Sequence, residues 1–188
     1  AIDCALKCPQ ISKVIVSTDC QEIAAVARKY GAEVPFMRPA SLAKDDSSEI
    51  EAWRHAIDSL RAQGEDFDTF VSVPATAPLR ESRDITACLQ RLQEDNTDLV
   101  VSAEVARRSP YFNMVKKTDS GFVELVAALP EKIMRRQDAP MVYDMTTVCY
   151  ASRPDHVLRM KSLWDGNVAM VEIPAVRAID IDDEMDFL

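Results

Sequence analysis

The chain has 188 residues, a length typical of one domain, and its 47% hydrophobic and 28% charged residues are typical of a globular protein. Its formal net charge of −9 disfavours nucleic acid as a partner, because an acidic surface repels phosphate backbones, but it suits a protein that holds a divalent cation. No apolar run is long enough for a membrane-spanning helix, and no signal or transit segment is recognisable, so we expect a cytoplasmic protein with no membrane partner.

The first hundred residues alternate between helix-like and strand-like segments. Residues 1–7 have helical periodicity without a start signal, and the apolar run over 13–17 predicts a strand buried on both faces. Asp19 is the expected N-cap of a helix over 21–30 that ends at Gly31. The next expected elements are a strand over 33–36, a helix capped by Asp46 or Ser47 and ending near 62, a strand over 68–73, a helix over 82–94 and a strand over 98–103. This alternation predicts right-handed βαβ units and a parallel sheet.

The pattern changes between residues 107 and 146, where no long amphipathic helix is present. Extended pieces over 112–117 and 122–126 flank Asp119-Ser120-Gly121, which predicts a hairpin. We expect this segment to be an insertion into a single domain. Beyond it the sequence predicts a strand over 147–151, a helix over 154–160, a strand over 169–173 and a final helix after residue 182.

Cysteine and histidine give little indication of chemistry. Cys4 and Cys8 lie one helical turn apart, which leaves a metal site open, although two buried thiols in a cytosolic protein are the better interpretation. The two histidines are far apart in the sequence, so a Ser-His-Asp triad is not expected. The cysteines, which match no zinc or redox motif, are Cys4, Cys8, Cys20, Cys88 and Cys149.

The sharpest local signal is Ile179-Asp180-Ile181-Asp182. In an extended chain, residues two apart face the same way, so the isoleucines are expected in the core and both carboxylates at one external point. Two converging carboxylates suit Mg²⁺, which is usually held by one or two carboxylates and substrate phosphates. From the residues alone, a strand end whose acids favour the following helix N-terminus is the plainer interpretation.

Two further segments carry groups that can bind an anion. The loop from Pro74 to Arg80 follows an expected strand, and ligands of open parallel sheets bind beyond the carboxyl ends of strands. Arg80 can form a bidentate pair with a carboxylate or phosphate, but a rigid turn with a surface arginine is an equal alternative. Residues 135–138 (RRQD) can neutralise an anionic substrate, pair with acids of a partner subunit or remain a solvated charge pair.

The segments 111–115 and 143–147 mix aromatic, amide and hydroxyl groups on an apolar background. Such a mixture is what a sugar pocket requires. Core strands whose hydroxyls are hydrogen-bonded internally are the plainer interpretation.

Five stretches, in this order and spacing, resemble the CMP-sialic acid synthetases (acylneuraminate cytidylyltransferases). Each motif is weak alone, but together they cover essentially the whole chain. The resemblance implies an α/β fold, a Rossmann-like, GT-A-like nucleotidyltransferase with a mostly parallel sheet, as one domain over 1–188 with a small dimerisation and sugar-side insertion over 107–146. The stretches are VIVSTDCQEIAAVARKYGAEVPFMRPASLA, VPATAPLR, DLVVSAEV, RRQDAPMVY and AIDIDDEMDF.

The resemblance also implies the reaction. Such an enzyme uses Mg²⁺ and CTP, and the anomeric hydroxyl of a nonulosonic acid attacks the α-phosphate while pyrophosphate leaves. Asp180 and Asp182 match the family's catalytic, metal-binding acids, and Arg136 matches an arginine that can serve the active site of the partner in a homodimer. The expected nucleotide contacts are Arg38, Ser47 and Ser48, and the expected substrate contacts are Thr76, Arg80, Arg136, Gln137, Tyr143 and Thr146.

The chain departs from the family's pattern in three places. The family's N-terminal glycine-rich loop, which grips the triphosphate, is missing, so we expect that the chain is a fragment or omits this loop, and that the native protein has the missing central strand. Pro74 stands where relatives commonly have a sugar-contacting glutamine, and residues 143–147 (YDMTT) replace an aromatic-Arg-Pro-Asn-Gly run. Both sugar-side changes favour a legionaminic- or pseudaminic-type sugar of a bacterial surface polysaccharide.

Two other functions remain open from the sequence. A non-catalytic dimeric domain that binds a nucleotide or sugar is consistent with the missing phosphate loop. A nucleotidyltransferase for another sugar acid or a sugar phosphate is consistent with the changed sugar side.

Overall fold

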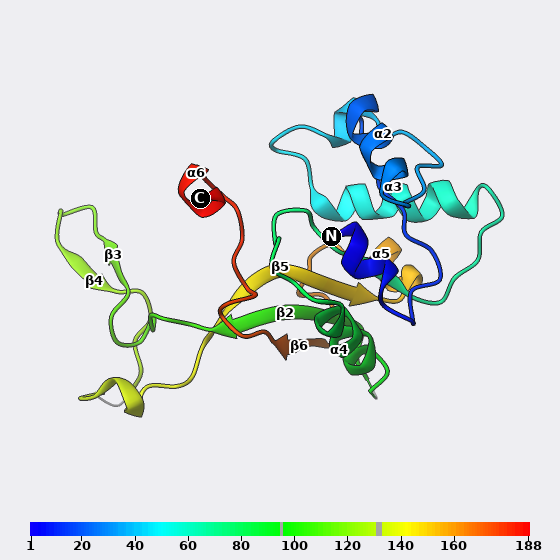
Figure 1. Ribbon diagram of the computed structural model, residues 1–188. Coiled ribbons are helices and arrows are strands. Elements are labelled where there is room, and N and C mark those ends of the chain that lie inside the picture. The colour runs from blue at the N-terminus through cyan, green and yellow to red at the C-terminus, as the bar shows by residue number, and fades with distance from the viewer. Residues whose placement is uncertain (95, 131–132) are drawn as a thin grey trace.

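The computed structural model describes residues 1–94, 96–130 and 133–188, and Figure 1 shows a central sheet with helices on both faces. The sheet has the strand order β1-β5-β2-β6. Its strands are β1 (Phe70–Ser72), β5 (Tyr143–Ser152), β2 (Leu99–Val105) and β6 (Val168–Glu172). Strand β6 runs parallel to β2, whereas β5 runs antiparallel to both β1 and β2. Three of the four strands therefore share one direction, and the sheet is mostly parallel, as expected.

Strand β5 is the exception to the parallel sheet that the alternation predicted. Strands β1 and β2 point the same way, but β5 lies between them. The reason is the insertion: the chain leaves the carboxyl end of β2 and re-enters the sheet at that same end, so the returning strand runs the opposite way. The mixed α/β fold thus contains one strand, β5, that the insertion reverses.

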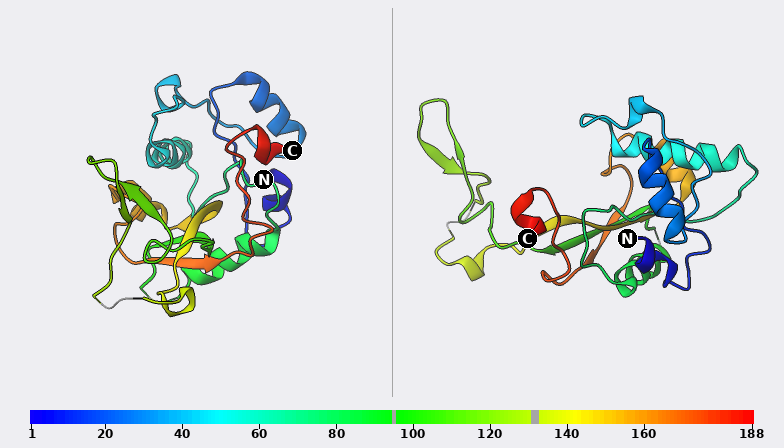
Figure 2. Two further views of the ribbon diagram at one scale, coloured as in Figure 1. Left: turned by 90° about the vertical axis from the view of Figure 1, so that its left-hand side faces the viewer. Right: turned by 45° about the horizontal axis from the view of Figure 1, so that its top comes forward.

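Two apolar clusters cover the two faces of the sheet. Helix α4 (Ser82–Leu92) packs on one face together with α1 (Ile2–Leu6) and residues that follow it. Helices α3 (Glu49–Arg61) and α5 (Pro154–Arg159) belong to the cluster on the other face. Helix α2 (Gln21–Lys29) lies above α3 in the view of Figure 1 and to the side of it in the left view of Figure 2. Alternating residues of β2 supply both clusters, because neighbouring side chains of a strand point to opposite faces.

Helix positions follow the sequence well, but two expected caps are wrong. The N-cap of α2 is Cys20 rather than Asp19, and α3 begins after Ser48 rather than after Asp46 or Ser47. The Ser47 hydroxyl is used elsewhere, since it accepts a hydrogen bond from the backbone N–H of Lys44 at 2.9 Å. A short polar side chain that closes a turn in this way is no longer available to cap a helix.

The strand expected over 13–17 is wrong in the structure. This segment makes one isolated parallel bridge, between Ile15 and Glu33, and its residues are not fully buried. The strand expected over 33–36 is reduced to the same bridge. On its other side the segment borders a groove of about 520 Å³, which Val14 and Val16 line together with Val71 of β1. An apolar run indicates burial, but here part of that run faces the groove instead of a neighbouring strand.

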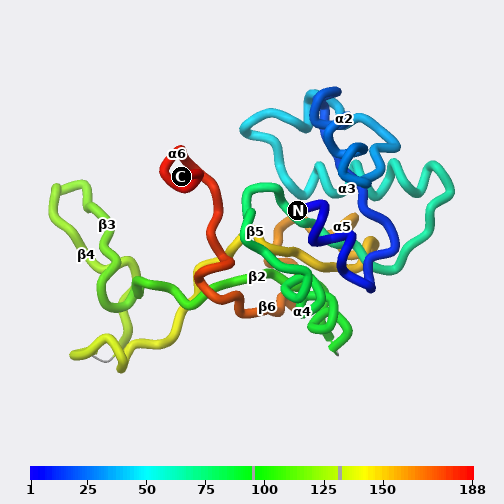
Figure 3. The backbone as a smooth tube through the Cα atoms, in the orientation of Figure 1, coloured from blue at the N-terminus to red at the C-terminus, as the bar shows by residue number. Residues whose placement is uncertain are grey.

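The insertion projects from the body of the molecule, as the tube in Figure 3 shows. Its two strands, β3 (Val115–Lys117) and β4 (Val123–Leu125), form the expected antiparallel hairpin, and all six strand residues are exposed. We call residues 107–146 the arm. The remaining short helices are η1 (Ala40–Leu42), η2 (Arg136–Asp138) and α6 (Glu184–Phe187). Within the described ranges, no helix has both the length and the apolar character needed to cross a lipid bilayer.

Candidate functional site

Several of the predicted site residues gather at one edge of the sheet. This is the carboxyl edge, where β1, β2 and β6 end and β5 begins, on the side of the arm in Figure 1. Three segments meet there: the loop over 74–80 after β1, the first half of β5 and the segment over 173–182 after β6. Ligands of open α/β sheets bind beyond the carboxyl ends of the strands.

A buried ion pair fixes the segment that leads to the predicted acids. Arg177 donates hydrogen bonds to both carboxylate oxygens of Asp84, from Nη2 to Oδ1 at 2.8 Å and from Nε to Oδ2 at 3.0 Å. Asp84 is 3% exposed, and its side chain also accepts the N–H of Glu81 in the capping box of α4. The hydrogen bonds with Asp84 raise the pKa of Arg177. The segment before Asp180 is thereby tied to the start of α4.

Asp180 has a carboxylate oxygen without a protein partner. Its Oδ1 is buried and accepts no hydrogen bond in the described structure, while the N–H of the next residue, Ile181, donates to the carbonyl of Thr76 at 2.9 Å. A buried oxygen in this state is costly unless a ligand completes it. The expectation that Ile179 enters the core is wrong, because this side chain is 41% exposed. The alternation assumed a strand, and this segment is not part of the sheet.

This donor set fits Mg²⁺. In the residues for which the structure gives positions, no group of three histidine, cysteine or acidic side chains gathers as a metal site. Mg²⁺ does not need one, because it usually takes one or two carboxylates and completes its shell with phosphate oxygens and water. Asp182 is exposed two residues after Asp180 and is available as the second carboxylate.

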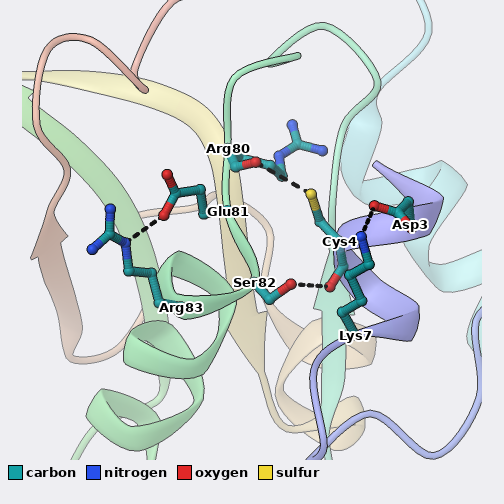
Figure 4. Close-up of a pocket in the computed structure, with 7 residues that line it drawn as sticks. All are labelled: Asp3, Cys4, Lys7, Arg80, Glu81, Ser82 and Arg83. Carbon is teal, nitrogen blue, oxygen red and sulfur yellow. Dashed lines mark hydrogen bonds and ion pairs between the residues drawn. The ribbon is translucent and has the colours of Figure 1, made fainter.

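Arg80 is buried, so the alternative of a surface arginine is wrong. It is 3% exposed, and Figure 4 shows its guanidinium directed away from Glu81 and Arg83. Its Nη2 donates to the carbonyl of Thr147 at 3.2 Å, whereas Nε and Nη1 are buried without a partner in the described structure. Burial lowers the pKa of Arg80, and nearby acidic groups, among them Asp180, oppose this shift. Arginine nevertheless stays charged, so the site holds a buried cation with unused donors.

The predicted threonines differ in what they can reach. The Thr76 hydroxyl is exposed and lies 3.2 Å from the hydroxyl of Thr147. Thr146 is buried, and its hydroxyl donates to the Ser102 hydroxyl at 2.9 Å, so it faces the interior. Sequence reasoning missed Thr147 and Ser102 as individual residues. The only sequence signal for Ser102 is one hydroxyl within an apolar strand.

The predicted nucleotide contacts lie in the loops on the side of α2 and α3. Arg38 donates from Nε to the Ser17 hydroxyl at 3.2 Å and from Nη2 to the Ser17 carbonyl. Ser47 closes a turn, and Ser48 is the N-cap of α3 without a side-chain capping bond. Among the described side chains, no hydrogen bond or ion pair joins these residues to Asp180 or Arg80.

The predicted contacts of the arm lie near its base. Arg136 is exposed and donates to the carbonyl of Arg107 at 2.7 Å, and Gln137 is exposed beside it in η2. The Tyr143 hydroxyl donates to Met141 Sδ at 3.2 Å. These bonds do not join Arg136 or Tyr143 to Asp180, Arg80 or Thr76.

In the described part of the chain no cysteine belongs to a group of three or more potential metal ligands, and the thiols of Cys4 and Cys8 bond within the protein. Cys4 donates its thiol proton to the carbonyl of Arg80 at 3.2 Å, as Figure 4 shows, and Cys8 Sγ lies 3.4 Å from the Thr86 hydroxyl. A hydrogen bond with Cys88 and burial raise the pKa of Cys149 well above its usual value. These thiols belong to the packing around α4.

Comparison with known proteins gives the family. The family model described as "Cytidylyltransferase" matches residues 1–172. "Post-translational flagellin modification protein B" of Campylobacter coli is 35% identical over 177 residues, which cover 93% of this chain and 73% of the relative. "CMP-N,N'-diacetyllegionaminic acid synthase" of Campylobacter jejuni is 36% identical with the same coverage. "N-acylneuraminate cytidylyltransferase" of Escherichia coli is 26% identical, over 99% of this chain and 43% of the relative.

Solved structures show the same fold at low identity. A 4-diphosphocytidyl-2C-methyl-D-erythritol synthase from Anaerococcus prevotii matches with a TM-score of 0.67 at 12% identity, over 98% of this chain and 82% of that one. A CMP:2-keto-3-deoxy-manno-octonic acid synthetase solved with CTP matches with a TM-score of 0.60 at 14% identity, over 92% and 76%. The family match, the relatives and the fold agree: the chain belongs to the cytidylyltransferase family and is a nucleotidyltransferase.

Proposed function

We propose that the chain transfers CMP from CTP to the anomeric hydroxyl of a nonulosonic acid and releases pyrophosphate. The observation that carries this proposal is the pair of incompletely bonded, buried groups at the carboxyl edge of the sheet. Asp180 offers a buried carboxylate oxygen, and Arg80 offers two buried guanidinium nitrogens. The cation of a bound triphosphate would be a partner for Asp180. A phosphate or a sugar carboxylate would be a partner for Arg80.

The reaction needs positioned charge more than an activated side chain. The bond between the anomeric oxygen and the α-phosphorus forms, the bond from that phosphorus to the pyrophosphate oxygen breaks, and the hydroxyl proton leaves. Holding both substrates in line supplies much of the rate. Asp180 and Asp182 would hold Mg²⁺, which supplies a Lewis acid for the phosphate oxygens when bound.

The remaining predicted contacts divide between the two substrates. Arg38, Ser47 and Ser48 would contact the nucleotide, where Arg38 can neutralise phosphate charge. Around the sugar acid, Arg80 is placed to bind an anionic group, and Thr76 offers an exposed hydroxyl at the same edge. Thr146 would act from the interior through Ser102. The arm residues that would complete the sugar side are Arg136, Gln137 and Tyr143.

The sugar acid we propose is of the legionaminic type. The relative named as a diacetyllegionaminic acid synthase is 36% identical over 93% of the chain, whereas the N-acylneuraminate cytidylyltransferase of Escherichia coli is 26% identical. A pseudaminic acid cytidylyltransferase of Campylobacter jejuni is 38% identical but over only 42% of this chain. The changed sugar-side residues Pro74 and 143–147 agree with a substrate other than sialic acid.

A homodimer built through the arm is part of this proposal. Strand pairing places Val115, Val123 and Leu125 on one face of the hairpin, which is apolar apart from Lys117. The ion pair of Lys116 with Glu124, at 3.1 Å, lies on the other face. A two-stranded hairpin is only marginally stable alone, so its exposed apolar face favours a protein partner. A second copy is favoured, because the arm has more basic than acidic residues whereas the whole chain carries −9.

A cytoplasmic location is also part of the proposal. All five cysteines are free thiols, which is typical of a reducing compartment. Measuring free thiols in protein taken directly from cells tests this point, and disulfides in that sample would contradict it.

Pyrophosphate release tests the reaction. The full product of the reading frame that encodes this chain is incubated with CTP and Mg²⁺ and with either N,N'-diacetyllegionaminic acid or N-acetylneuraminic acid. We expect release with the former and slower release with the latter. CTP binding by calorimetry without release from any nonulosonic acid would favour a non-catalytic binding domain. Release only with another sugar acid or a sugar phosphate would show a different acceptor.

A further inference from the structure

Strand β5 has a bulge of three residues where it pairs with the buried part of β2. Val101 pairs with Tyr150, but the next residue of β2, Ser102, pairs with Thr146. The intervening residues 147–149 therefore have no partner on β2. Bulges recur next to active sites, where they change the direction of a side chain.

The Ser102 hydroxyl stabilises this bulge through three hydrogen bonds to residues of β5. Ser102 is 0% exposed, and it donates its proton to the carbonyl of Thr146 at 3.0 Å. The same oxygen accepts the Thr146 hydroxyl at 2.9 Å and the backbone N–H of Cys149 at 3.0 Å. A hydroxyl has one proton and two lone pairs, so all of its bonding capacity is used. These bonds join Thr146, which precedes the unpaired segment, to Cys149, its last residue.

The three residues of the bulge differ in their surroundings: two are buried in the core and one is partly exposed. Val148 and Cys149 are both 0% exposed and pack in the cluster under α4. Thr147 remains partly exposed, and its carbonyl accepts a hydrogen bond from Arg80 Nη2 at 3.2 Å. The core contacts of its neighbours and the bond to Arg80 thus keep Thr147 at the carboxyl edge.

Thr147 forms a pair of hydroxyls with Thr76. Their oxygens lie 3.2 Å apart, and the carbonyl of Thr76 accepts the N–H of Ile181, next to Asp180. One hydrogen bond between two hydroxyls uses one proton and one lone pair, which leaves one proton and further lone pairs free. A polyhydroxylated ligand is the kind of molecule that such a pair can bind in a single orientation.

We propose that Thr147 contacts the sugar acid and, with Thr76, fixes its orientation, and that Ser102 is the residue that positions Thr147. This inference rests on the proposed function for the identity of the ligand. Thr147 would be a specificity-determining contact, while Ser102 would act only through the bulge. A site that uses its hydroxyls in this way discriminates against a ligand that cannot complete their hydrogen bonds.

Binding of the two substrates, measured separately, tests the role of Thr147. The probes are N,N'-diacetyllegionaminic acid, with and without a non-hydrolysable CTP analogue, and CTP with Mg²⁺. Thr147→Val, which keeps the shape and removes the hydroxyl, should weaken sugar-acid binding about tenfold and leave CTP binding unchanged. Thr147→Ser should restore most of the affinity. The control Thr86→Val removes a hydroxyl that donates to the Ser82 carbonyl within α4, at 3.1 Å, and should bind both probes normally.

Hydrogen exchange tests the role of Ser102. Ser102→Ala should speed amide exchange at Thr147 and Cys149 and lower sugar-acid affinity as Thr147→Val does, with CTP binding retained. Equal losses for both ligands, or unchanged exchange, would overturn the positioning role. Normal sugar-acid binding by Thr147→Val, or no binding by the unmodified protein, would overturn the contact. Sugar-acid binding without pyrophosphate release would instead reject only the proposed reaction.

Discussion

Asp180 differs from the other acids of its segment because one of its carboxylate oxygens is buried without a protein partner. An exposed carboxylate obtains hydrogen bonds from water, whereas a buried one must obtain them from the protein or a ligand. The buried oxygen of Asp180 therefore needs a cation or a hydrogen-bond donor. In the proposed metal site, the exposed Asp182 is the second ligand.

Removing either charge tests this assignment. Asp180→Asn and Asp182→Asn should each reduce pyrophosphate release by about a hundredfold or more, because an amide is a much poorer ligand for Mg²⁺ than a carboxylate. Circular dichroism should show the same fold. The control Glu184→Gln removes an exposed carboxylate of α6 in the same region and should retain activity. Full turnover by a folded Asp182→Asn protein would remove Asp182 from the metal site.

Tyr150 makes the stability of the fold depend on alkaline pH. Burial is the main cause that raises its pKa to about 12, and the nearby acids Glu49 and Asp180 add to the shift. A group whose pKa is higher in the folded state contributes stability that is fully present below its unfolded pKa. That contribution is lost as the pH rises through the folded pKa. For Tyr150 the loss falls between about pH 10 and about pH 12.

Tyr150→Phe should remove this part of the pH dependence. The ring contact with Trp53, at 5.3 Å between centroids, can remain in the variant. Urea unfolding at several pH values should therefore show a smaller loss of unfolding free energy above pH 10 than in the unmodified protein. Tyr30→Phe is the control, because Tyr30 is 63% exposed. Equal alkaline losses in the two variants would contradict the role of Tyr150.

Residue-level prediction from sequence singles out a side chain where its own chemistry is distinctive. Asp180 and Arg80 are recognisable from charge and from their position after strands, and both have incompletely bonded atoms at the carboxyl edge. Ser102 and Thr147 were missed because their significance depends on the pairing register of β5 with β2. A register shift leaves no periodic signal in either strand, so only the folded arrangement reveals it.

At the scale of elements, the ion pair of Arg177 with Asp84 joins two segments that carry the site. Asp84 is the third helical residue of α4 and part of its capping box, while Arg177 lies three residues before Asp180. Because the carboxylate is 3% exposed, removal of the arginine leaves a buried charge without its partner. The pair should therefore affect both the fold and the position of Asp180.

Arg177→Ala should lower the melting temperature by several degrees and reduce turnover. Differential scanning calorimetry and pyrophosphate release measure the two effects. Arg83→Ala is the control, because Arg83 lies next to Asp84 on α4 and its ion pair with Glu81 joins side chains that are 67% and 50% exposed. Exposed pairs contribute little to stability. Similar melting temperatures for the two variants would show that the buried pair is not required.

The elements themselves were predictable to different degrees for a physical reason. Helix α4 and the hairpin are local structures: the periodicity of the helix and the turn residues of the hairpin lie close together in the sequence. The strand predicted over 13–17 was wrong because a strand needs a ladder of hydrogen bonds with at least one neighbour, and the fold gives this segment a single bridge. The direction of β5 likewise follows from where the insertion leaves and re-enters the sheet.

At the scale of the whole molecule, the body and the arm differ in how their apolar residues are covered. In the body, the two clusters bury side chains on both faces of the sheet. In the arm, Phe122 is 76% exposed, Val123 65% and Val115 58%. Isolated exposed apolar residues are ordinary, but contiguous ones on a projecting hairpin indicate an interface. Burying such surface on association gains roughly 25 cal/mol per Å².

Charges placed on the arm should therefore separate the proposed dimer. Phe122→Lys combined with Val123→Lys should shift the protein from dimer to monomer in sedimentation velocity, because a charged residue cannot be buried there without cost. The fold of the body should persist, since the arm residues do not belong to either apolar cluster. Trp164→Lys is the control, because it adds charge at a side chain that is 67% exposed elsewhere on the body.

If Arg136 also serves the partner's active site, the monomeric variant should lose turnover while it still binds CTP. A double lysine variant that remains dimeric would show that the arm is not the interface.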